Sequence, residues 1–315
     1  MKLSFALPIG GAWATPDNQR RIAQEAERLG YHGLWTFQRL FFPLQPQNDY
    51  PAMHGQPWPD VFRRTMDPVV SLAFVAAVTH RIRLGTGVLL MPYYSPLVMA
   101  KELATLDQVS GGRLDVGLGL GWSRDEYQAV GVPYRDRGRR GDEFLRCLKT
   151  IWSEDVAEFH GEFYDLPRSA VEVKPVQRPH PPLLIGGYGP AVIRRVIELG
   201  DGFIGGNVPL TEVARLTARL REEGKAGERD RRPLQLVSRG TVRVHDSPQG
   251  PERRPLWGSL DEVREDIGRY AGAGLTELFL DPNFDPAIGG HPDPDVALER
   301  ALSLLAAFAP RGQDV

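Results

Sequence analysis

The feature that most constrains the fold of this chain is a regular alternation of short apolar segments with segments of helical periodicity. The apolar segments have the length and composition of strands, and turn residues bound them. Eight strands are expected, at residues 2–7, 33–37, 82–90, 114–119, 182–185, 202–204, 234–244 and 276–280. Helices are expected between them, at residues 16–29, 69–78, 97–108, 141–152, 191–199, 211–223 and 260–273.

Strands that alternate with helices form parallel sheets with right-handed crossovers. Eight such units within 315 residues therefore predict an α/β fold, a single (β/α)8 TIM barrel that spans residues 1–315 as one domain. The alternative is an open doubly wound sheet. A Gly-x-Gly-x-x-Gly loop after the first strand would favour that sheet, and Gly10-Gly11 alone does not provide one.

Four segments do not fit the eight units and are expected to be insertions, at residues 40–66, 152–181, 246–259 and 283–295. The second of them contains an expected hairpin at 157–164. Because loops after the strands build the active site of such barrels, the first and last insertions are candidate lids, with plain surface loops as the alternative. Aromatic residues in the first insertion indicate either an apolar pocket or a cluster packed on itself: Phe41, Phe42, Tyr50, Trp58 and Phe62.

Charge and composition exclude several classes of function. The formal net charge is −2, from 38 basic and 40 acidic residues, so nothing drives binding to nucleic acid or to a membrane surface. The single cysteine, Cys147, lies in an amphipathic helical segment and is expected in the core. The seven histidines show no metal-ligand spacing, and no metal is expected. Without a signal peptide or a long apolar run, a soluble cytoplasmic protein is expected.

Glycines gather where expected strands end, which is the face that carries active sites in a barrel. The segment 117–122 reads Gly-Leu-Gly-Leu-Gly-Trp, and without Cβ atoms a planar ligand can lie directly on its backbone. Close packing at a crowded corner is the alternative. The segment 185–190 reads Ile-Gly-Gly-Tyr-Gly-Pro before a helix, so free backbone N–H groups there can bind a phosphate, or else form only a tight turn.

Two further segments are ambiguous. Glycine within the third strand, at 85 and 87, marks a bulge or a close contact, and Thr86 between them can donate a hydrogen bond or serve as a β-former. The basic run at 135–140 is typical of a solvated loop, although one of its arginines can meet an acidic cofactor tail.

Several of these segments together resemble the luciferase-like monooxygenase superfamily, whose fold is a (β/α)8 barrel. The resemblance is carried by LDQVSGGRL at 106–114, FHGEFY at 159–164, KPVQRP at 174–179, and IGG at 185–187 followed by GDGF at 200–203. The segments GLGWSRDEY at 119–127, GVP at 131–133 and RG at 137–138 resemble the deazaflavin-dependent branch in particular.

The resemblance implies an oxidoreductase with coenzyme F420 as the favoured cofactor and FMN as the alternative. Residues implied to contact the cofactor ring are Thr86, Gly87, Val88, Gly119, Gly121 and Trp122, with a non-prolyl cis peptide at Gly87-Val88. Residues implied to hold the phosphate are Gly186, Gly187, Tyr188 and Gly189. A small-molecule substrate and a possible homodimer are implied as well.

One departure from the family pattern concerns catalysis. Many relatives carry an Asp-His pair at the end of the second strand, where this chain has Gln38-Arg39. Arginine stays protonated and glutamine does not titrate, so these two residues can position or polarise but cannot act as a base. Candidate catalytic residues are therefore Gln38, Arg39 and Glu126, and candidate proton carriers are Glu126, His54 and Tyr93.

Three functions remain open on the sequence. The first is hydride transfer between F420 and a small organic substrate, because a deazaflavin moves two electrons at once. The second is an FMN-dependent monooxygenase that uses O2. The third is a non-catalytic barrel subunit that binds a cofactor and stabilises a partner.

Overall fold

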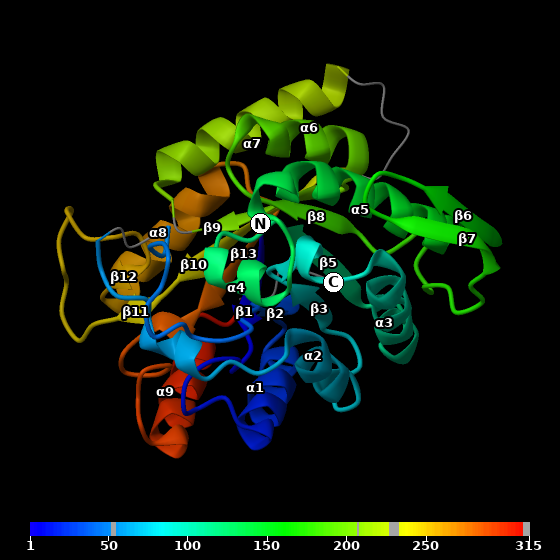
Figure 1. Ribbon diagram of the computed structural model, residues 1–315. Coiled ribbons are helices and arrows are strands. Elements are labelled where there is room, and N and C mark those ends of the chain that lie inside the picture. Colours follow the sequence, from blue (N-terminus) through cyan, green and yellow to red (C-terminus); the bar gives the residue numbers. More distant parts are fainter. Residues whose placement is uncertain (52–54, 207, 227–232, 311–315) are drawn as a thin grey trace.

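Parallel strands form the centre of the molecule, as Figure 1 shows. The computed structural model describes residues 1–51, 55–206, 208–226 and 233–310. The barrel strands are β1 (Lys2–Ala6), β2 (Gly33–Thr36), β3 (Arg83–Thr86) with β4 (Leu89–Leu90), β5 (Leu114–Gly119), β8 (Leu183–Gly186), β9 (Gly202–Gly206), β10 (Gln235–Thr241) and β13 (Glu277–Asp281).

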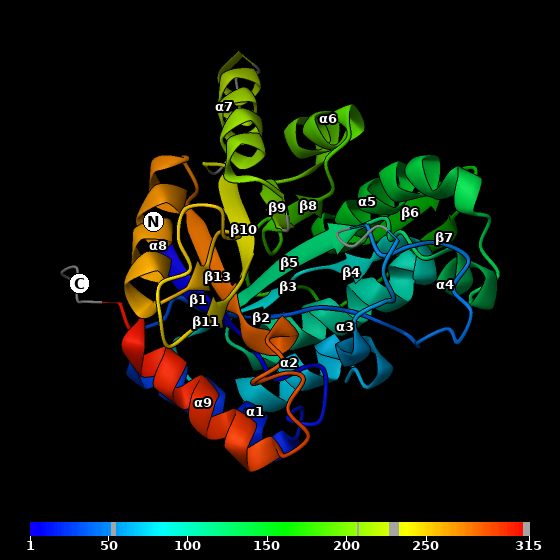
Figure 2. The same ribbon diagram turned by 90° about the vertical axis from the view of Figure 1, so that its left-hand side faces the viewer.

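The strands close into a ring in which every neighbouring pair is parallel. β1 lies between β2 and β13, and the pairing of β3 with β5 joins the two ends of the sheet. Closure excludes the open doubly wound sheet and confirms the predicted (β/α)8 barrel. The helices are α1 (Pro16–Arg28), α2 (Pro68–Ala76), α3 (Pro96–Val109), α4 (Arg124–Ala129), α5 (Arg137–Ser153), α6 (Pro190–Leu199), α7 (Leu210–Ala226), α8 (Leu260–Gly272) and α9 (Pro294–Ala307). Figures 1 and 2 show most of them around the outside of this ring, whereas the short α4 lies in front of the strands in Figure 1.

Local sequence sets where most of these helices begin. Proline at the first turn, with a preceding side chain that accepts from a backbone N–H, starts α1 after Thr15 and α2 after Asp67. Ser259 and Glu262 form a capping box at the start of α8. The buried faces of the helices pack on the strands, and Cys147 of α5 is buried there as predicted.

The inside of the barrel is filled by alternate side chains of the strands, because successive residues of a strand point to opposite faces. This interior cluster consists of Ala6, Trp35, Leu184, Ile204, Val237 and Phe279, with Val88 packed against it. Trp35 and Phe279 stack with their ring centroids 5.2 Å apart. Beneath them, Glu277 accepts hydrogen bonds from Ser4 Oγ at 2.6 Å and Trp35 Nε1 at 2.7 Å.

Several elements differ from the sequence-based expectation. The third strand is not continuous over 82–90 but is divided into β3 and β4 around Gly87. The hairpin is longer than the expected 157–164, with β6 (Val156–His160) paired to β7 (Asp165–Ala170). The basic run at 135–140 is not a loop, because α5 begins at Arg137. Helices α4 and α9 were not predicted, and α9 begins within the insertion expected at 283–295.

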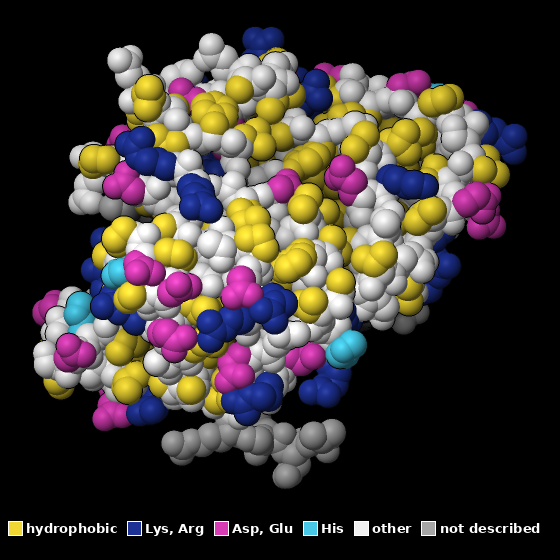
Figure 3. Space-filling model, turned by 90° about the horizontal axis from the view of Figure 1, so that it is seen from below, with side chains coloured by type: hydrophobic (Ala, Val, Ile, Leu, Met, Phe, Trp, Pro, Cys, Tyr) yellow, Lys and Arg dark blue, Asp and Glu magenta, His cyan; other side chains and the backbone are white. Residues whose placement is uncertain are grey.

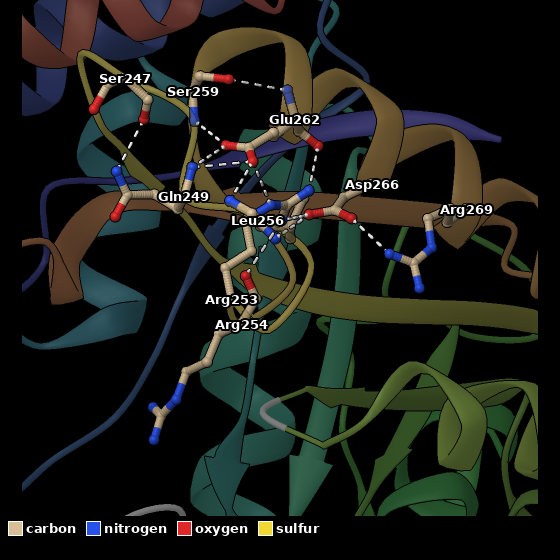
Figure 4. A network of polar contacts seen from close by, with 10 residues as sticks. Ser247, Gln249, Arg253, Arg254, Leu256, Ser259, Glu262, Asp266 and Arg269 are labelled. Carbon is tan, nitrogen blue, oxygen red and sulfur yellow. Dashed lines mark hydrogen bonds and ion pairs between the residues drawn. The ribbon is translucent and has the colours of Figure 1, made fainter.

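The insertion at 246–259 is tied to α8 by the polar network drawn in Figure 4. The Glu262 carboxylate accepts from the backbone N–H groups of Gln249, Gly250 and Ser259. These bonds hold the pKa of Glu262 down at about 2. Buried Asp266 pairs with Arg253 and accepts from the N–H of Leu256 at 2.7 Å. The loop after β10 is thus fixed by carboxylates of the next helix.

On the face drawn in Figure 3, basic and acidic side chains lie interspersed with apolar ones. This mixture fits the nearly balanced formal charge of −2. Across the ranges that the structure describes, no helix combines the length and apolar content needed to span a bilayer.

Candidate functional site

The mouth of the barrel, at the carboxyl ends of its strands, has two unlike halves. On one side each strand ends at a glycine or directly before one: Gly87, Gly119, Gly186 and Gly206. The strands on the other side present Phe37, Arg239 and Asp281. We call the first side the glycine half. It supplies bare backbone at the face where barrel enzymes carry their active sites.

Gly87 and Gly186 face inward, toward the interior cluster. A Cβ on Gly87 would lie 3.3 Å from Ile204 Cδ1 and 3.4 Å from Phe279 Cζ, both in the interior cluster. A Cβ on Gly186 would lie 3.2 Å from Val88 Cγ1. Larger side chains at these positions would therefore fill the space above Ile204 and Val88. The glycine half has the shape of a cradle for a flat ligand.

Val88 is the side chain that stands within the glycine half. The Gly87-Val88 peptide is cis, as the resemblance implies. A Cβ on Gly119 would approach Val88 Cγ2 to 2.7 Å, so glycine at 119 is needed for the packing of Val88. Gly121 has φ +77° and lies against the Tyr93 hydroxyl, which a Cβ would approach to 2.9 Å. Both glycines thus have a packing reason as well as the predicted role at a cofactor.

The hydroxyl of Thr86 is occupied within the sheet. It donates to the Gly117 carbonyl and accepts from the Gly117 N–H, both at 2.9 Å, and Thr86 is fully buried. A contact between Thr86 and a ring would have to use its backbone. The side chain itself holds β3 to β5 where β3 ends.

The predicted phosphate site lies at the start of α6. Gly189 is the N-cap residue, no side chain caps this turn, and a Cβ on Gly189 would meet no atom within 4 Å. Gly187 has φ +129°, a conformation open to glycine. The Tyr188 hydroxyl bonds to the backbone of Gly206 and so links this turn to β9. Open space at an uncapped helix N-terminus fits the binding of a phosphate group.

A buried ion pair joins two of the predicted catalytic residues. Arg39 Nη1 lies 3.1 Å from Glu126 Oε2, and the two side chains are 5% and 0% exposed. Glu126 also accepts from the Leu40 N–H at 2.8 Å and from the Tyr93 hydroxyl at 3.1 Å. The Arg39 guanidinium lies over the Trp122 ring, 4.6 Å from its centroid. The arrangement places a fixed positive charge at the end of β2.

Gln38 is bound on both ends of its amide. Its oxygen accepts from the Leu90 N–H at 2.8 Å, and its nitrogen donates to the Tyr94 hydroxyl. These bonds fix β2 against the segment after β4. Burial raises the pKa of Tyr94 to about 12. Burial and the neighbouring Glu126 likewise raise the pKa of Tyr93, so this phenol is protonated at neutral pH.

An aromatic cluster from the insertion at 40–66 covers part of the mouth. Tyr50, Trp58 and Phe62 are buried and pack on one another and on Trp122, with Trp58 and Trp122 centroids 4.6 Å apart. Phe42 packs against the cluster, whereas Phe41 is 37% exposed. The aromatics of this insertion thus contact each other, which was the second of the two predicted arrangements. His54, the remaining proton-carrier candidate, lies outside the described residues.

The sequence reasoning missed a second ion pair at the mouth. Arg239 at the end of β10 donates from Nε to Asp281 Oδ2 of β13 at 2.6 Å. Its guanidinium lies 4.3 Å from the centroid of the Phe284 ring. Burial lowers the pKa of Arg239, but the interactions of its guanidinium with Asp281 and Tyr50 outweigh this effect and the net shift is upward. Its alternation with Val237 along β10 was the available signal that Arg239 points into the barrel.

Comparison with known proteins gives a family assignment. The sequence profile of a family described as "Luciferase-like monooxygenase" matches residues 2–254. An uncharacterized protein of Mycobacterium bovis is 37% identical over 184 residues, which are 58% of this chain and 65% of that protein. The FMNH2-dependent dimethylsulfone monooxygenase of Pseudomonas putida is 34% identical over 190 residues, 59% of this chain and 48% of that one. The matches thus span from about half to two thirds of these relatives.

Solved structures share the fold over nearly the whole chain. Monooxygenase RslO1 from Streptomyces bottropensis superposes with a TM-score of 0.79 at 24% identity, covering 98% of both chains. The coenzyme F420 dependent tetrahydromethanopterin reductase from Methanopyrus kandleri superposes with a TM-score of 0.70 at 16% identity, again over 98% of both. Proteins named for F420 and for FMN thus both occur among the matches.

Proposed function

Because the chain belongs to the luciferase-like monooxygenase family, we propose that it is an oxidoreductase that moves a hydride between coenzyme F420 and a small organic substrate. The observation that carries the proposal is the glycine half of the mouth, which leaves backbone accessible to a planar ring above Ile204 and Val88. The GLGWSRDEY segment favours F420 as the ring, through its resemblance to the deazaflavin branch.

The chain's own residues fit such a ring and its phosphate. Gly87, Val88 and Gly186 would contact the ring, and the N–H groups at the start of α6 near Gly189 would hold the phosphate. When bound, the cofactor supplies a two-electron donor or acceptor. The fold supplies orientation and a fixed electrostatic field beside it.

Arg39 supplies positive charge, and Glu126 fixes its position. The carboxylate of Glu126 is enclosed by the Leu40 N–H, the Tyr93 hydroxyl and Arg39, so it has no free face toward a substrate. We therefore assign Glu126 as a positioning residue and Arg39 as a guanidinium whose charge Glu126 balances and whose place at the mouth Glu126 fixes. Gln38 and Arg39 provide no base, so Tyr93 and His54 stay the candidate proton carriers of the chain, beside water.

The experiment that tests the proposal is a fluorescence titration of purified apoprotein with oxidised F420 and, separately, with FMN. Tight binding of F420 and weak binding of FMN is the expected result. As a matched pair of variants, Gly189→Val blocks the phosphate turn, whereas Gly268→Ala changes an α8 glycine that has no atom within 4 Å of an added Cβ. Only the first should weaken cofactor binding.

A second candidate function is supported by one specific observation, the 34% identity to the FMNH2-dependent dimethylsulfone monooxygenase. On that hypothesis the same cradle would hold reduced FMN for reaction with O2. Preference for FMN in the titration would favour the monooxygenase over the F420 enzyme. Binding of neither cofactor would contradict both and favour the non-catalytic barrel subunit.

A further inference from the structure

The Arg239–Asp281 pair is held rigidly inside the barrel mouth. The side chains are 13% and 1% exposed. Asp281 Oδ2 accepts from Arg239 Nε, while Asp281 Oδ1 accepts from the N–H and the side-chain amide of Asn283 at 2.9 and 2.8 Å. Asn283 Oδ1 in turn accepts from the N–H of Ile9 at 3.2 Å and from the Trp13 indole at 3.2 Å. This network fixes the direction of the guanidinium.

One nitrogen of Arg239 has no acceptor. Its Nη2 is buried and makes no hydrogen bond within the described part of the chain, although the Tyr50 side chain also interacts with the guanidinium. A buried donor left without an acceptor costs about 1–3 kcal/mol, so such a group calls for an explanation in a folded protein. Arg239 lies two residues beyond interior Val237 and pairs in register with Gly206 of β9. It therefore stands at the edge of the glycine half, directly beside Gly206.

The charge on Arg239 is already balanced. Asp281 neutralises it, and the other buried pair at the mouth, Arg39 with Glu126, is neutral in the same way. A further anion would add an unbalanced buried charge, which is costly. An uncharged oxygen that accepts one hydrogen bond would satisfy Nη2 without that cost. The rings of Phe37 and Phe284, with centroids 5.6 and 4.3 Å from the guanidinium carbon, supply an apolar surface beside it.

We propose that Arg239 is the substrate-anchoring residue of this site, and that its Nη2 donates to the carbonyl-type oxygen of an uncharged substrate with an apolar body. The proposal rests on the proposed function, because it places the substrate beside the cofactor's cradle. It adds the substrate class and the residue that recognises it. A site whose buried donor hydrogen-bonds to a substrate oxygen binds an analogue without that oxygen more weakly, because the donor is then left unpaired.

The test is isothermal titration calorimetry of the purified protein with three probes: acetophenone, α-methylstyrene, in which a CH2 group replaces the carbonyl oxygen, and benzoate. Acetophenone should bind about tenfold more tightly than either of the others. Arg239→Lys keeps a charge beside Asp281 but removes the forked donor, and it should abolish the preference. If the single change prevents folding, the double variant Arg239→Met with Asp281→Asn, which removes both charges, is tested in its place. Arg254 lies over Trp257, so Arg254→Met is the matched control and should keep the preference for acetophenone.

Equal affinity of the wild type for acetophenone and α-methylstyrene, or no binding of either, would overturn the proposal. Tighter binding of benzoate would mean that the site takes an anion, and a preference that survives in Arg239→Lys would assign the donor elsewhere. Each titration is repeated with F420 and with FMN present. If neither cofactor binds while acetophenone is still preferred, the proposed function fails and the anchoring role of Arg239 stands.

Discussion

Removing the charge of Glu126 should destabilise the protein more than most single substitutions. In Glu126→Gln, the buried Arg39 guanidinium loses its counter-ion. The new amide has a single acceptor oxygen, whereas the carboxylate uses one oxygen for the Leu40 N–H and the other for the Tyr93 hydroxyl. Opposite unit charges 3.1 Å apart attract by about 5 kcal/mol at an effective dielectric constant of ~20. Breaking a buried pair typically costs about 3–5 kcal/mol. We expect a loss of about that size in the free energy of unfolding.

A double-mutant cycle measures the pair itself. Arg39→Met combined with Glu126→Gln removes both charges, so no buried charge is left alone, and the double variant should be more stable than the sum of the single changes predicts. Urea unfolding followed by circular dichroism gives the four free energies. Asp60→Asn, which breaks an exposed pair with Arg63 at 2.9 Å, is the control and should cost less than about 1 kcal/mol.

The reasoning would be refuted if Glu126→Gln unfolded at the same urea concentration as the wild type. It would also be refuted if the double variant lost as much stability as the two single variants added together. Either result would mean that the pair at the end of β2 is not a coupled buried charge pair.

Three further predictions concern other parts of the chain. Burial raises the pKa of Glu277 from 4.5 to about 7, so the folded state favours the protonated carboxyl. Its contribution to the free energy of unfolding is full below pH 4.5 and falls by about 3 kcal/mol as the pH rises to 7. Glu277→Gln should flatten this pH dependence, as measured by urea unfolding across that range. Cys147 should react with a thiol reagent only after unfolding, since it is buried and its pKa is raised to about 11; modification at the rate of a free thiol would contradict its place in the core. Gly189→Val should weaken binding of a phosphate-bearing cofactor at least tenfold in the fluorescence titration, because the valine fills the open turn before α6. Gly268→Ala leaves that turn open, so equal affinity of the two variants would place the phosphate elsewhere.

The barrel was predictable because its signal is repeated along the chain. Eight apolar segments alternate with helical ones, and only closure could not be read from that alternation. The pairing of β3 with β5 supplies it. Helix α4 was missed because its six residues are too few for a helical period, and α9 because its start lies in a Pro- and Gly-rich segment.

The candidate site was predictable in its glycines and only partly in its charges. Gly87 with Val88 and the turn at Gly189 were singled out from strand ends and family motifs. The pairing of Arg39 with Glu126 joins the segment after β2 to helix α4, which are far apart in the chain, so the sequence indicated each residue alone and not the contact. Arg239 was overlooked because a single arginine in a β segment is most often exposed, and only the closed barrel turns it inward.

The most direct test of the account is a crystal structure of the protein with F420 bound. We expect the ring against Gly87, Val88 and Gly186, its phosphate at the N-terminus of α6, and Arg239 beside the ring at the β10 edge of the cradle. This arrangement would be contradicted if the cofactor lay outside the mouth, for example in the surface hollow lined by Leu97 and Val98 of α3, or if its ring lay on Arg239 and left the glycine half empty.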